Sequence, residues 1–350
     1  MVRTITCGDR LIGPGHPCFI IAEAGVNHNG DLQLARRLVD VAVKAGADAV
    51  KFQAYKADRL VTLNAPKADY QVRATGSLES QLEMLRRLEL SPETQQELME
   101  YARGRGILFL STPFEEESAD LLDRMGVPAF KIPSGEITNL PFLAHVARKG
   151  KPMIVSTGMA SLGEVETAVR TIETTGNHNV ALLHCVSNYP ANPVDVNLRA
   201  IETMTLAFNL PVGYSDHTLG IEVPLGAVAL GACIVEKHFT LDRALPGPDQ
   251  QASAEPAELV ALVVGIRKVE KALGHGRKEP ASSEACTAAV ARKSLVAAKP
   301  ILAGTRLTED LIAIKRPGTG LPPTLRTLLV GRIAKQDIPA DTLLSLDMIT

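Results

Sequence analysis

The sequence lacks three features that would each define a class of protein. Its five cysteines are scattered and form no CxxC pair, which argues against a disulfide framework or a cysteine metal cluster and favours reduced thiols. A formal net charge of −2 gives no broad positive field for nucleic acid or membrane phosphates, so local groups must hold any anionic substrate. The apolar segments are too short and interrupted to span a bilayer. We therefore expect a cytoplasmic globular protein.

What the sequence does contain is a repeated unit: a short apolar run, a polar tip, and a stretch with the helical spacing of apolar residues. Residues 31–45 are typical of such a helix, with Asp31 as the N-cap and Gly46 as the terminator. Further helices are predicted to begin near Ser91, Ser161 and Glu255. The predicted strands are 19–27, 49–55, 107–113, 129–135, 153–158, 181–187, 212–217 and 234–239.

Eight strands that alternate with helices predict an α/β fold of the (β/α)8 TIM barrel type, in which the strand tips face one pocket at the C-terminal rim. A doubly wound open sheet also alternates strands and helices, but it concentrates its functional residues at one switch point. Because nearly every strand tip in this sequence is polar, the barrel is favoured.

Composition suggests four segments. Residues 1–18 contain a Gly-Pro-Gly turn and are expected to form a hairpin that closes the lower end of the barrel, which spans 19–274. Residues 275–290 are polar, with Gly and Pro, and are expected to be a linker. Residues 291–350 contain short apolar pieces separated by turn signals, which predicts a small, mainly β domain.

Charged residues interrupt three of the apolar strands. Glu23 lies in "IIAEAGVNHNGD", Lys51 in "AVKFQAY" and Lys131 in "AFKIPSGE". A lysine inside an apolar strand is costly unless its ammonium reaches an anion, so two such lysines at adjacent strand tips predict a site for phosphate or carboxylate. The alternative is a salt bridge to a barrel carboxylate such as Glu23 or Glu136. Hydroxyl groups that could donate to phosphate oxygens stand at other tips: Thr112, Ser134, Ser156 and Ser215.

Two histidines end the last two predicted strands. His217 lies in "GYSDHTLG" and His238 in "EKHFT". Since adjacent barrel strands bring their tips together, the two imidazoles could share a weakly held divalent cation such as Mn²⁺. Two independent hydrogen-bonded histidines are the alternative.

Taken in order, the motifs "IAEAGVNHNGD", "VKFQ", "FLSTPF", "KIPSGEITN", "STGM", "YSDHTLG", "EKHFT", "PGPD" and "KRPGTG" resemble the sialic acid synthase family. The resemblance covers the barrel and a C-terminal antifreeze-like (SAF) domain. It implies metal-assisted condensation of phosphoenolpyruvate with an N-acylated mannosamine-type sugar and water, with C–O cleavage releasing phosphate. It also implies a divalent metal, Mn²⁺ first with Mg²⁺ or Co²⁺ as alternatives, and a domain-swapped homodimer.

The resemblance also assigns roles to residues. It implies that Glu23 is the acid–base carboxylate, that Lys51 and Lys131 assist catalysis, and that His217 and His238 hold the metal. Ser187 stands where N-acetylneuraminate synthases often have Asn, and is kept as a phosphoenolpyruvate contact. The other contacts to phosphoenolpyruvate are Lys51, Thr112, Lys131, Ser134, Ser156 and Ser215. The sugar contacts are Gln53, Glu136, Tyr189, Asp249 and, from the C-terminal domain, Arg316.

Three alternatives concern the activity. With N-acetylmannosamine as the sugar the product is N-acetylneuraminate, which we place first; a 2,4-diacetamido-2,4,6-trideoxymannose would give a legionaminate. A Schiff-base aldolase on the same barrel would use Lys51, Lys131 or Lys237 as its nucleophile. In a non-enzymatic alternative, the C-terminal module binds ice or glycan and the barrel is a scaffold.

Overall fold

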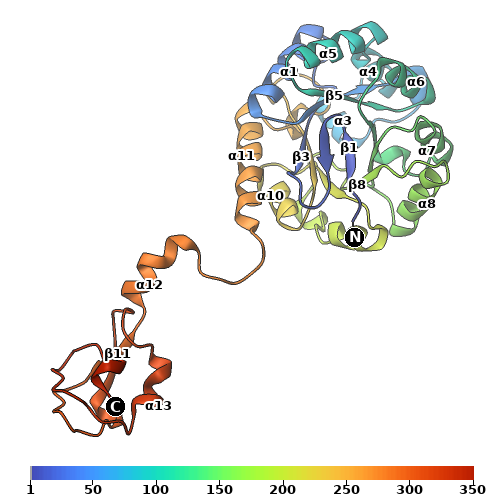
Figure 1. Cartoon of the computed structure of the whole chain (residues 1–350). Coiled ribbons are helices and arrows are strands. Elements are labelled where there is room, and N and C mark those ends of the chain that lie inside the picture. Colours follow the sequence, from blue (N-terminus) through green and yellow to red (C-terminus); the bar gives the residue numbers. More distant parts are fainter. Residues whose placement is uncertain (1) are drawn as a thin grey trace. The chain divides into compact units, whose positions relative to one another are not determined.

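The computed structural model describes residues 2–350, which form two compact units that divide between Gly274 and His275. In the first unit the strands lie inside a ring of helices (Figure 1). None of the helices among residues 2–350 is long and apolar enough to cross a membrane.

The predicted TIM barrel is confirmed. Eight parallel strands are hydrogen-bonded in the order β5-β4-β3-β10-β9-β8-β7-β6, and β5 and β6 at the two ends of this order lie side by side, so the sheet curls into a near-closed barrel and not an open doubly wound sheet. The strands are β3 (Phe19–Gly25), β4 (Ala49–Ala54), β5 (Leu108–Pro113), β6 (Phe130–Ile132), β7 (Met153–Ser156), β8 (Val180–Cys185), β9 (Val212–Asp216) and β10 (Ile234–His238).

Each barrel strand is followed by a covering helix. The first shows why these segments are helical: the Asp31 carboxylate accepts hydrogen bonds from the backbone N–H groups of Gln33 and Leu34, and Gly46 ends the helix with φ 81°. The apolar face of the same helix packs onto the barrel. The covering helices are α1 (Leu32–Ala45), α5 (Pro92–Gly104), α6 (Glu116–Met125), α7 (Leu140–Ala147), α8 (Leu162–Glu173), α9 (Ala200–Phe208), α10 (Glu222–Ala229) and α11 (Pro256–Leu273).

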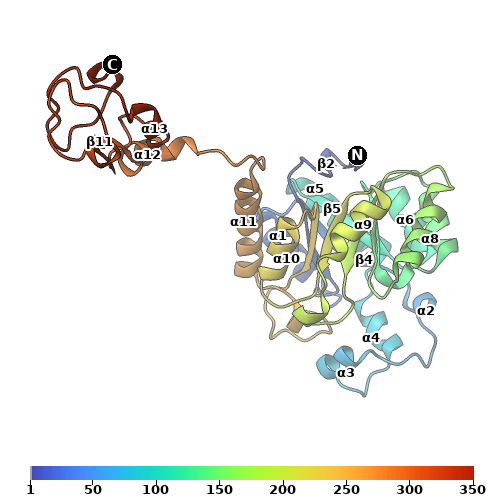
Figure 2. The same cartoon turned by 90° about the horizontal axis from the view of Figure 1, so that it is seen from below.

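A hairpin of β1 (Ile5–Cys7) and β2 (Arg10–Ile12) lies at the N-terminal end of the barrel. Its side chains Ile5, Cys7 and Ile12 are buried with residues from the starts of the barrel strands, including Phe19 and Ile234. At the opposite end of the barrel, an insertion between β4 and α5 carries the short helices α2 (Ala57–Leu60), α3 (Asp69–Thr75) and α4 (Gln81–Leu88) (Figure 2). The hairpin thus closes the N-terminal end of the barrel, and the insertion extends its C-terminal end.

The second unit is small and contains a two-stranded antiparallel sheet of β11 (Ser294–Ala297) and β12 (Ile312–Lys315). Its own core includes Leu295, Ile301 and Leu344. Helix α12 (Ala285–Ala291) lies mostly within the stretch predicted to be a linker, and α13 is Arg326–Leu329. Short 3₁₀ turns complete the chain: Ser134–Glu136, Pro193–Asp195, Gln250–Ala252, Ser282–Glu284, Glu309–Leu311, Pro323–Leu325 and Leu346–Met348.

Candidate active site

A cavity of about 380 Å³ opens at the C-terminal ends of the barrel strands. This is the end at which TIM barrels carry their active sites, because the loops that follow the strands converge there. With the exception of Lys237, the structure brings the barrel residues proposed from the sequence into the lining of this cavity: Glu23, Lys51, Gln53, Thr112, Lys131, Ser134, Glu136, Ser156, Ser187, Tyr189, Ser215, His217, His238 and Asp249.

Four buried charges occupy the floor of the cavity. The Nζ atom of Lys51 lies 2.7 Å from Glu23 Oε2 and 3.7 Å from Glu236 Oε2, and the Nζ atom of Lys131 lies 3.1 Å from Glu236 Oε1. Both lysines therefore form salt bridges to barrel carboxylates, as the alternative predicted, and their partners are Glu23 and Glu236. Glu136 instead accepts a hydrogen bond from Asn139.

One expectation about the lysines was wrong. Lys51 and Lys131 do not stand on adjacent strands, because β5 lies between β4 and β6. They meet in the barrel interior, where inward-facing residues of alternate strands form one layer, and Glu236 of β10 reaches both.

Sequence reasoning missed Glu236. It lies in the apolar strand "IVEKH", 2% exposed, and the signal that identified Glu23, a carboxylate inside an apolar run, was present there too. His238 stands two residues after Glu236 in β10, so the side chains of Glu236 and His238 lie on the same side of the sheet.

The carboxyl groups of Glu23 and Glu236 have pKa values shifted in opposite directions. Burial raises the pKa of Glu23 to about 7, against the opposing effect of Lys51. Burial acts in the same direction on Glu236, but the ammonium groups of Lys131 and Lys51 overcome it and lower the pKa of Glu236 to about 2. Burial would lower the pKa of Lys51, yet Glu23 and Glu236 raise it. Glu236 is thus a fixed negative charge, whereas Glu23 is poised to exchange a proton near neutral pH.

Hydroxyl groups surround the lysines. Ser134 Oγ accepts a hydrogen bond from the backbone N–H of Gly158, 3.0 Å away, and a Cβ placed on Gly158 would lie 2.7 Å from that oxygen and 2.3 Å from Ser187 Oγ. The missing side chain therefore lets two hydroxyls converge beside Gly158. Thr112 Oγ1 accepts from Lys51, and Ser215 Oγ donates to Glu236.

The two histidines lie side by side, with ring centroids 5.5 Å apart. Nδ1 of His217 is 2.7 Å from the carbonyl oxygen of Val186, which leaves Nε2 as the nitrogen able to bind a cation. Nδ1 of His238 is buried and has no hydrogen-bond partner among the described residues. No group of three or more His, Cys, Asp or Glu side chains suited to a metal occurs in residues 2–350. The pair fits a divalent ion with two protein ligands and suits no closed structural site.

Aromatic and polar groups line the mouth of the cavity. The ring of Tyr189 stacks on His217 at 4.0 Å between centroids and on Tyr70 of α3 at 4.9 Å. Oδ2 of Asp249 lies 4.0 Å from His238 Nδ1, and burial raises the pKa of Asp249 to about 6. Gln53 is half-buried at the end of β4.

Two predicted residues lie elsewhere. Lys237 faces the opposite side of β10 from Glu236 and His238, and its Nζ donates to Asp216 (2.6 Å) and to the carbonyl of Thr218 (2.8 Å). Arg316 belongs to the second unit, where it is exposed and its Nε donates to the carbonyl of Ala291.

A barrel with a buried lysine pair, converging hydroxyls, an acid–base carboxylate and two adjacent histidines is suited to an anionic substrate and a carbonyl partner. Comparison with known proteins agrees with this class. The model of the NeuB family matches residues 38–278, and the SAF domain model matches residues 292–350.

The chain belongs to the NeuB family and carries its SAF domain. It is 49% identical to the N,N'-diacetyllegionaminic acid synthase of Legionella pneumophila over 95% of this chain and 94% of that one. It is 39% identical to the N-acetylneuraminate-9-phosphate synthase of Homo sapiens, over 93% and 91%. The structure of an N-acetylneuraminic acid synthetase from Leptospira borgpetersenii in complex with citrate aligns with a TM-score of 0.73 and 42% identity, over 81% and 94%.

The protein is therefore an enzyme, a phosphoenolpyruvate-dependent nonulosonic acid synthase, and the non-enzymatic alternative falls. Enzymes of this family use a metal and act on phosphoenolpyruvate and an acetamido sugar.

Proposed function

We propose that the enzyme condenses phosphoenolpyruvate with 2,4-diacetamido-2,4,6-trideoxymannose and water, giving N,N'-diacetyllegionaminate and inorganic phosphate. The identity of 49% to a legionaminic acid synthase, against 39% to an N-acetylneuraminate-9-phosphate synthase, supports this sugar. The sequence alone favours N-acetylmannosamine, whereas the identities to known enzymes favour the diacetamido sugar. The chemistry rests on one observation: a lysine pair, two converging hydroxyls and a carboxylate of raised pKa meet in a single buried cavity.

Phosphoenolpyruvate binds on the cavity floor. Lys51 and Lys131 are the cations that its phosphate and carboxylate meet, in a buried site where charge attraction is strong. The hydroxyls of Ser134 and Ser187 offer donors at one place, beside Gly158, whose backbone N–H orients Ser134 Oγ. Ser156 Oγ is buried without a hydrogen-bond partner among the described residues, as expected of a group whose partner is a substrate. Thr112 and Ser215 complete this set of contacts.

In the reaction, the C2–C3 π electrons of phosphoenolpyruvate form a bond from C3 to the aldehyde carbon of the sugar. The aldehyde C=O π bond breaks, its oxygen takes up a proton to become a hydroxyl, and a water oxygen bonds to C2. The Glu23 carboxylate accepts the proton of that water, for which its pKa near neutrality is suited. The new C2 hydroxyl then passes its proton to the phosphate as the bond from C2 to the phosphate oxygen breaks, which leaves the ketone, and the two lysines neutralise the departing phosphate. A divalent ion, when bound by His217 and His238, supplies Lewis-acid polarisation of the aldehyde oxygen. Mn²⁺ remains our first choice.

The sugar extends from the histidines toward the mouth of the cavity. Gln53, Glu136, Tyr189 and Asp249 line the same cavity and are proposed as the contacts of the sugar. A Schiff-base route is less well supported, because a nucleophilic lysine must be neutral and both cavity lysines are paired with buried carboxylates. Lys237 does not line the cavity.

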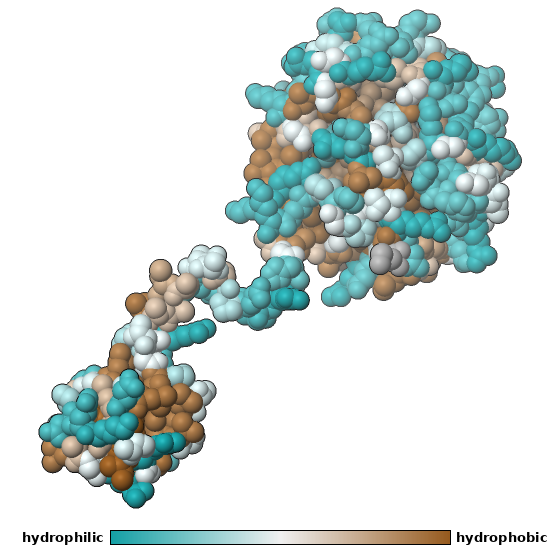
Figure 3. Space-filling model, in the orientation of Figure 1, coloured by the Kyte–Doolittle hydropathy of each residue, from teal (hydrophilic) through white to brown (hydrophobic). Residues whose placement is uncertain are grey.

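We propose further that the enzyme is a homodimer in which the SAF domain of one subunit brings Arg316 to the sugar's N-acyl group in the other. The proposal follows from the family resemblance. The second unit also exposes large apolar side chains, among them Leu302 (67%) and Leu346 (55%), and apolar residues gather on the face of this unit seen in Figure 3. Such surfaces are often covered by another subunit.

Phosphate release from phosphoenolpyruvate in the presence of each sugar tests the proposed reaction. The enzyme is expected to release phosphate with both sugars and to have the higher kcat/KM with the diacetamido sugar. The cytoplasmic location stays a prediction.

A further inference from the structure

The insertion between β4 and α5 gives the cavity a wall of a different character from its floor. Leu60 and Val61 at the end of α2 and Leu85 of α4 line the cavity and are half-buried, as is Phe114 after β5. Two fully buried apolar side chains of α4, Met84 and Leu88, also line the cavity on this side. The floor is charged, whereas this wall offers mainly carbon atoms.

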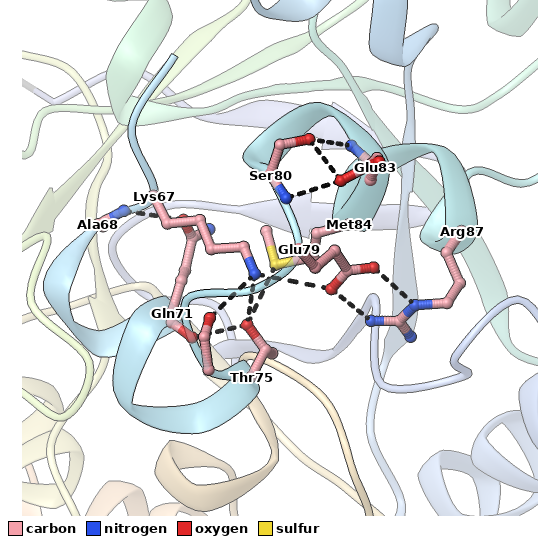
Figure 4. A network of polar contacts seen from close by, with 10 residues as sticks. Lys67, Ala68, Gln71, Thr75, Glu79, Ser80, Glu83, Met84 and Arg87 are labelled. Carbon is pink, nitrogen blue, oxygen red and sulfur yellow. Dashed lines mark hydrogen bonds and ion pairs between the residues drawn. The ribbon is translucent and has the colours of Figure 1, made fainter. Parts of the chain in front are cut away.

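The wall is held in place by polar contacts inside the insertion (Figure 4). Nζ of Lys67 donates to Thr75 Oγ1 (2.9 Å) and to the carbonyl of Gly76 (3.2 Å), and lies 3.6 Å from Glu79 Oε2. Glu79 also pairs with Arg87 of α4. The side chain of Lys67 is 3% exposed, so this ion pair is part of the fold of the insertion.

Further contacts tie the two ends of the insertion to each other, and Tyr55, which follows β4, ties the insertion to the barrel. The Glu89 carboxylate accepts hydrogen bonds from Lys56 Nζ (2.7 Å) and from the backbone N–H of Ala57 (2.9 Å), and the Tyr55 hydroxyl donates to the carbonyl of Leu85 (3.2 Å). Leu85 is therefore anchored through its own backbone. A preorganised wall can discriminate between substrates, because it does not yield to fit a wrong one.

In the proposed reaction, the far end of the sugar faces this wall. Its aldehyde carbon must meet phosphoenolpyruvate beside Glu23 and the two histidines, near the strand ends. Its opposite end then points outward, where the insertion lies beyond the end of β4 (Figure 2). Gln81 of α4 also lines this part, and its amide can donate to and accept from an acetamido group.

We infer that the wall formed by Leu60, Val61, Leu85 and Phe114 selects a sugar whose distal end is apolar, a 6-deoxy carbon with a neighbouring acetamido methyl, over one with hydroxyl groups there. This inference rests on the proposed function and names the part of the site that sets its sugar. A methyl group against these side chains buries apolar surface, whereas a hydroxyl would lose hydrogen bonds to water without replacement. The expected discrimination is about 10-fold to 100-fold in kcat/KM, the range for hydrophobic pockets.

The test compares kcat/KM for 2,4-diacetamido-2,4,6-trideoxymannose and for N-acetylmannosamine at saturating phosphoenolpyruvate. The variants are Val61→Thr, which replaces a methyl by a hydroxyl at nearly the same volume, and Leu85→Asn. Both are expected to lower the preference for the diacetamido sugar about 10-fold while the KM for phosphoenolpyruvate stays as in the wild type. Leu85→Met, which stays apolar, should keep the preference.

Leu78→Asn is the matched control, since Leu78 lies in the same insertion but is fully exposed and does not line the cavity. It should keep the wild-type preference. Folded, active Val61→Thr and Leu85→Asn variants that also keep it would overturn the inference and leave the proposed function standing. A wild-type enzyme that releases phosphate with neither sugar would overturn both.

Discussion

Lys51 and Glu23 form an ion pair of 2.7 Å on neighbouring strands, in register, inside the barrel. Both side chains are almost fully buried, and Glu236 approaches the same ammonium group from a third strand. This contact explains why an apolar strand tolerates a carboxylate at position 23. It also places a group of raised pKa beside the cations that we expect to hold phosphoenolpyruvate.

The first prediction concerns pH. If Glu23 must be ionised to accept a proton, kcat/KM should rise as the pH increases through about 7, the pKa that burial gives this group. Rates of phosphate release between about pH 5.5 and about pH 8.5 would show this limb. Glu23→Gln should remove most of the activity, whereas Glu236, with its pKa lowered to about 2, does not titrate in this range.

Stability has the opposite pH dependence at this group. A pKa raised in the folded state means that the Glu23 contribution to stability is fully present below its unfolded pKa of 4.5 and is lost as the pH rises through about 7. For the first prediction, a kcat/KM that is equal at the two ends of the pH range over which phosphate release is measured would contradict the role of Glu23 as the proton acceptor.

The second prediction concerns the ion pair itself. Lys51→Met leaves two buried carboxylates with one cation fewer and should lower the free energy of unfolding by about 3–5 kcal/mol, measured by urea denaturation. Lys56→Met is the control: its ion pair with Glu89 has the same 2.7 Å length, but the lysine side chain is 44% exposed, so the expected loss is about 0–1 kcal/mol. Equal losses of unfolding free energy in Lys51→Met and Lys56→Met would contradict the claim that burial makes the Lys51 ion pair the more costly one to break.

The third prediction uses Gly158. An added Cβ would lie 2.3 Å from Ser187 Oγ and 2.7 Å from Ser134 Oγ, so Gly158→Ala must displace both hydroxyls. If these groups hold phosphoenolpyruvate, its KM should rise about 10-fold or more. Gly163→Ala is the matched control, because no atom lies within 4 Å of an added Cβ there. An unchanged KM for phosphoenolpyruvate in the folded Gly158→Ala variant would mean that the Ser134 and Ser187 hydroxyls do not bind this substrate.

The sequence predicted the order of strands and helices more accurately than the residues at which each strand begins and ends. All eight strands were found because each is an apolar run, but the predicted strand over 129–135 is only Phe130–Ile132 in the structure. Ser134, Gly135 and Glu136 form a 3₁₀ turn after Pro133. Polar tips look continuous with their strands in a sequence, since apolar patterning does not show where hydrogen bonding between strands stops.

The sequence could name most members of the site, Glu236 excepted, but not how they pair. Lys51 and Lys131 were identified by their cost inside apolar strands, whereas their meeting through Glu236 depends on which residues share a layer of the closed barrel. The insertion over 56–90 was not foreseen, because its three helices are only 4 to 8 residues long and are shorter than a periodic pattern needs.

The fourth prediction tests the proposed exchange of SAF domains. Glu23→Gln and Arg316→Ala homodimers should each be nearly inactive. If Arg316 acts in the partner's barrel, subunits mixed by co-expression should recover about a quarter of the wild-type activity, because about half of the dimers are mixed and each has one intact site. No recovery in dimers shown to be mixed would mean that Arg316 acts within its own subunit, and an active Arg316→Ala homodimer would mean that Arg316 has no role in the reaction.

The most direct test of the proposed reaction is phosphate release by the metal-loaded enzyme from phosphoenolpyruvate with each of the two sugars. We predict release with both and a kcat/KM about 10-fold to 100-fold higher for 2,4-diacetamido-2,4,6-trideoxymannose than for N-acetylmannosamine. A higher kcat/KM for N-acetylmannosamine would contradict the assignment as a legionaminate synthase.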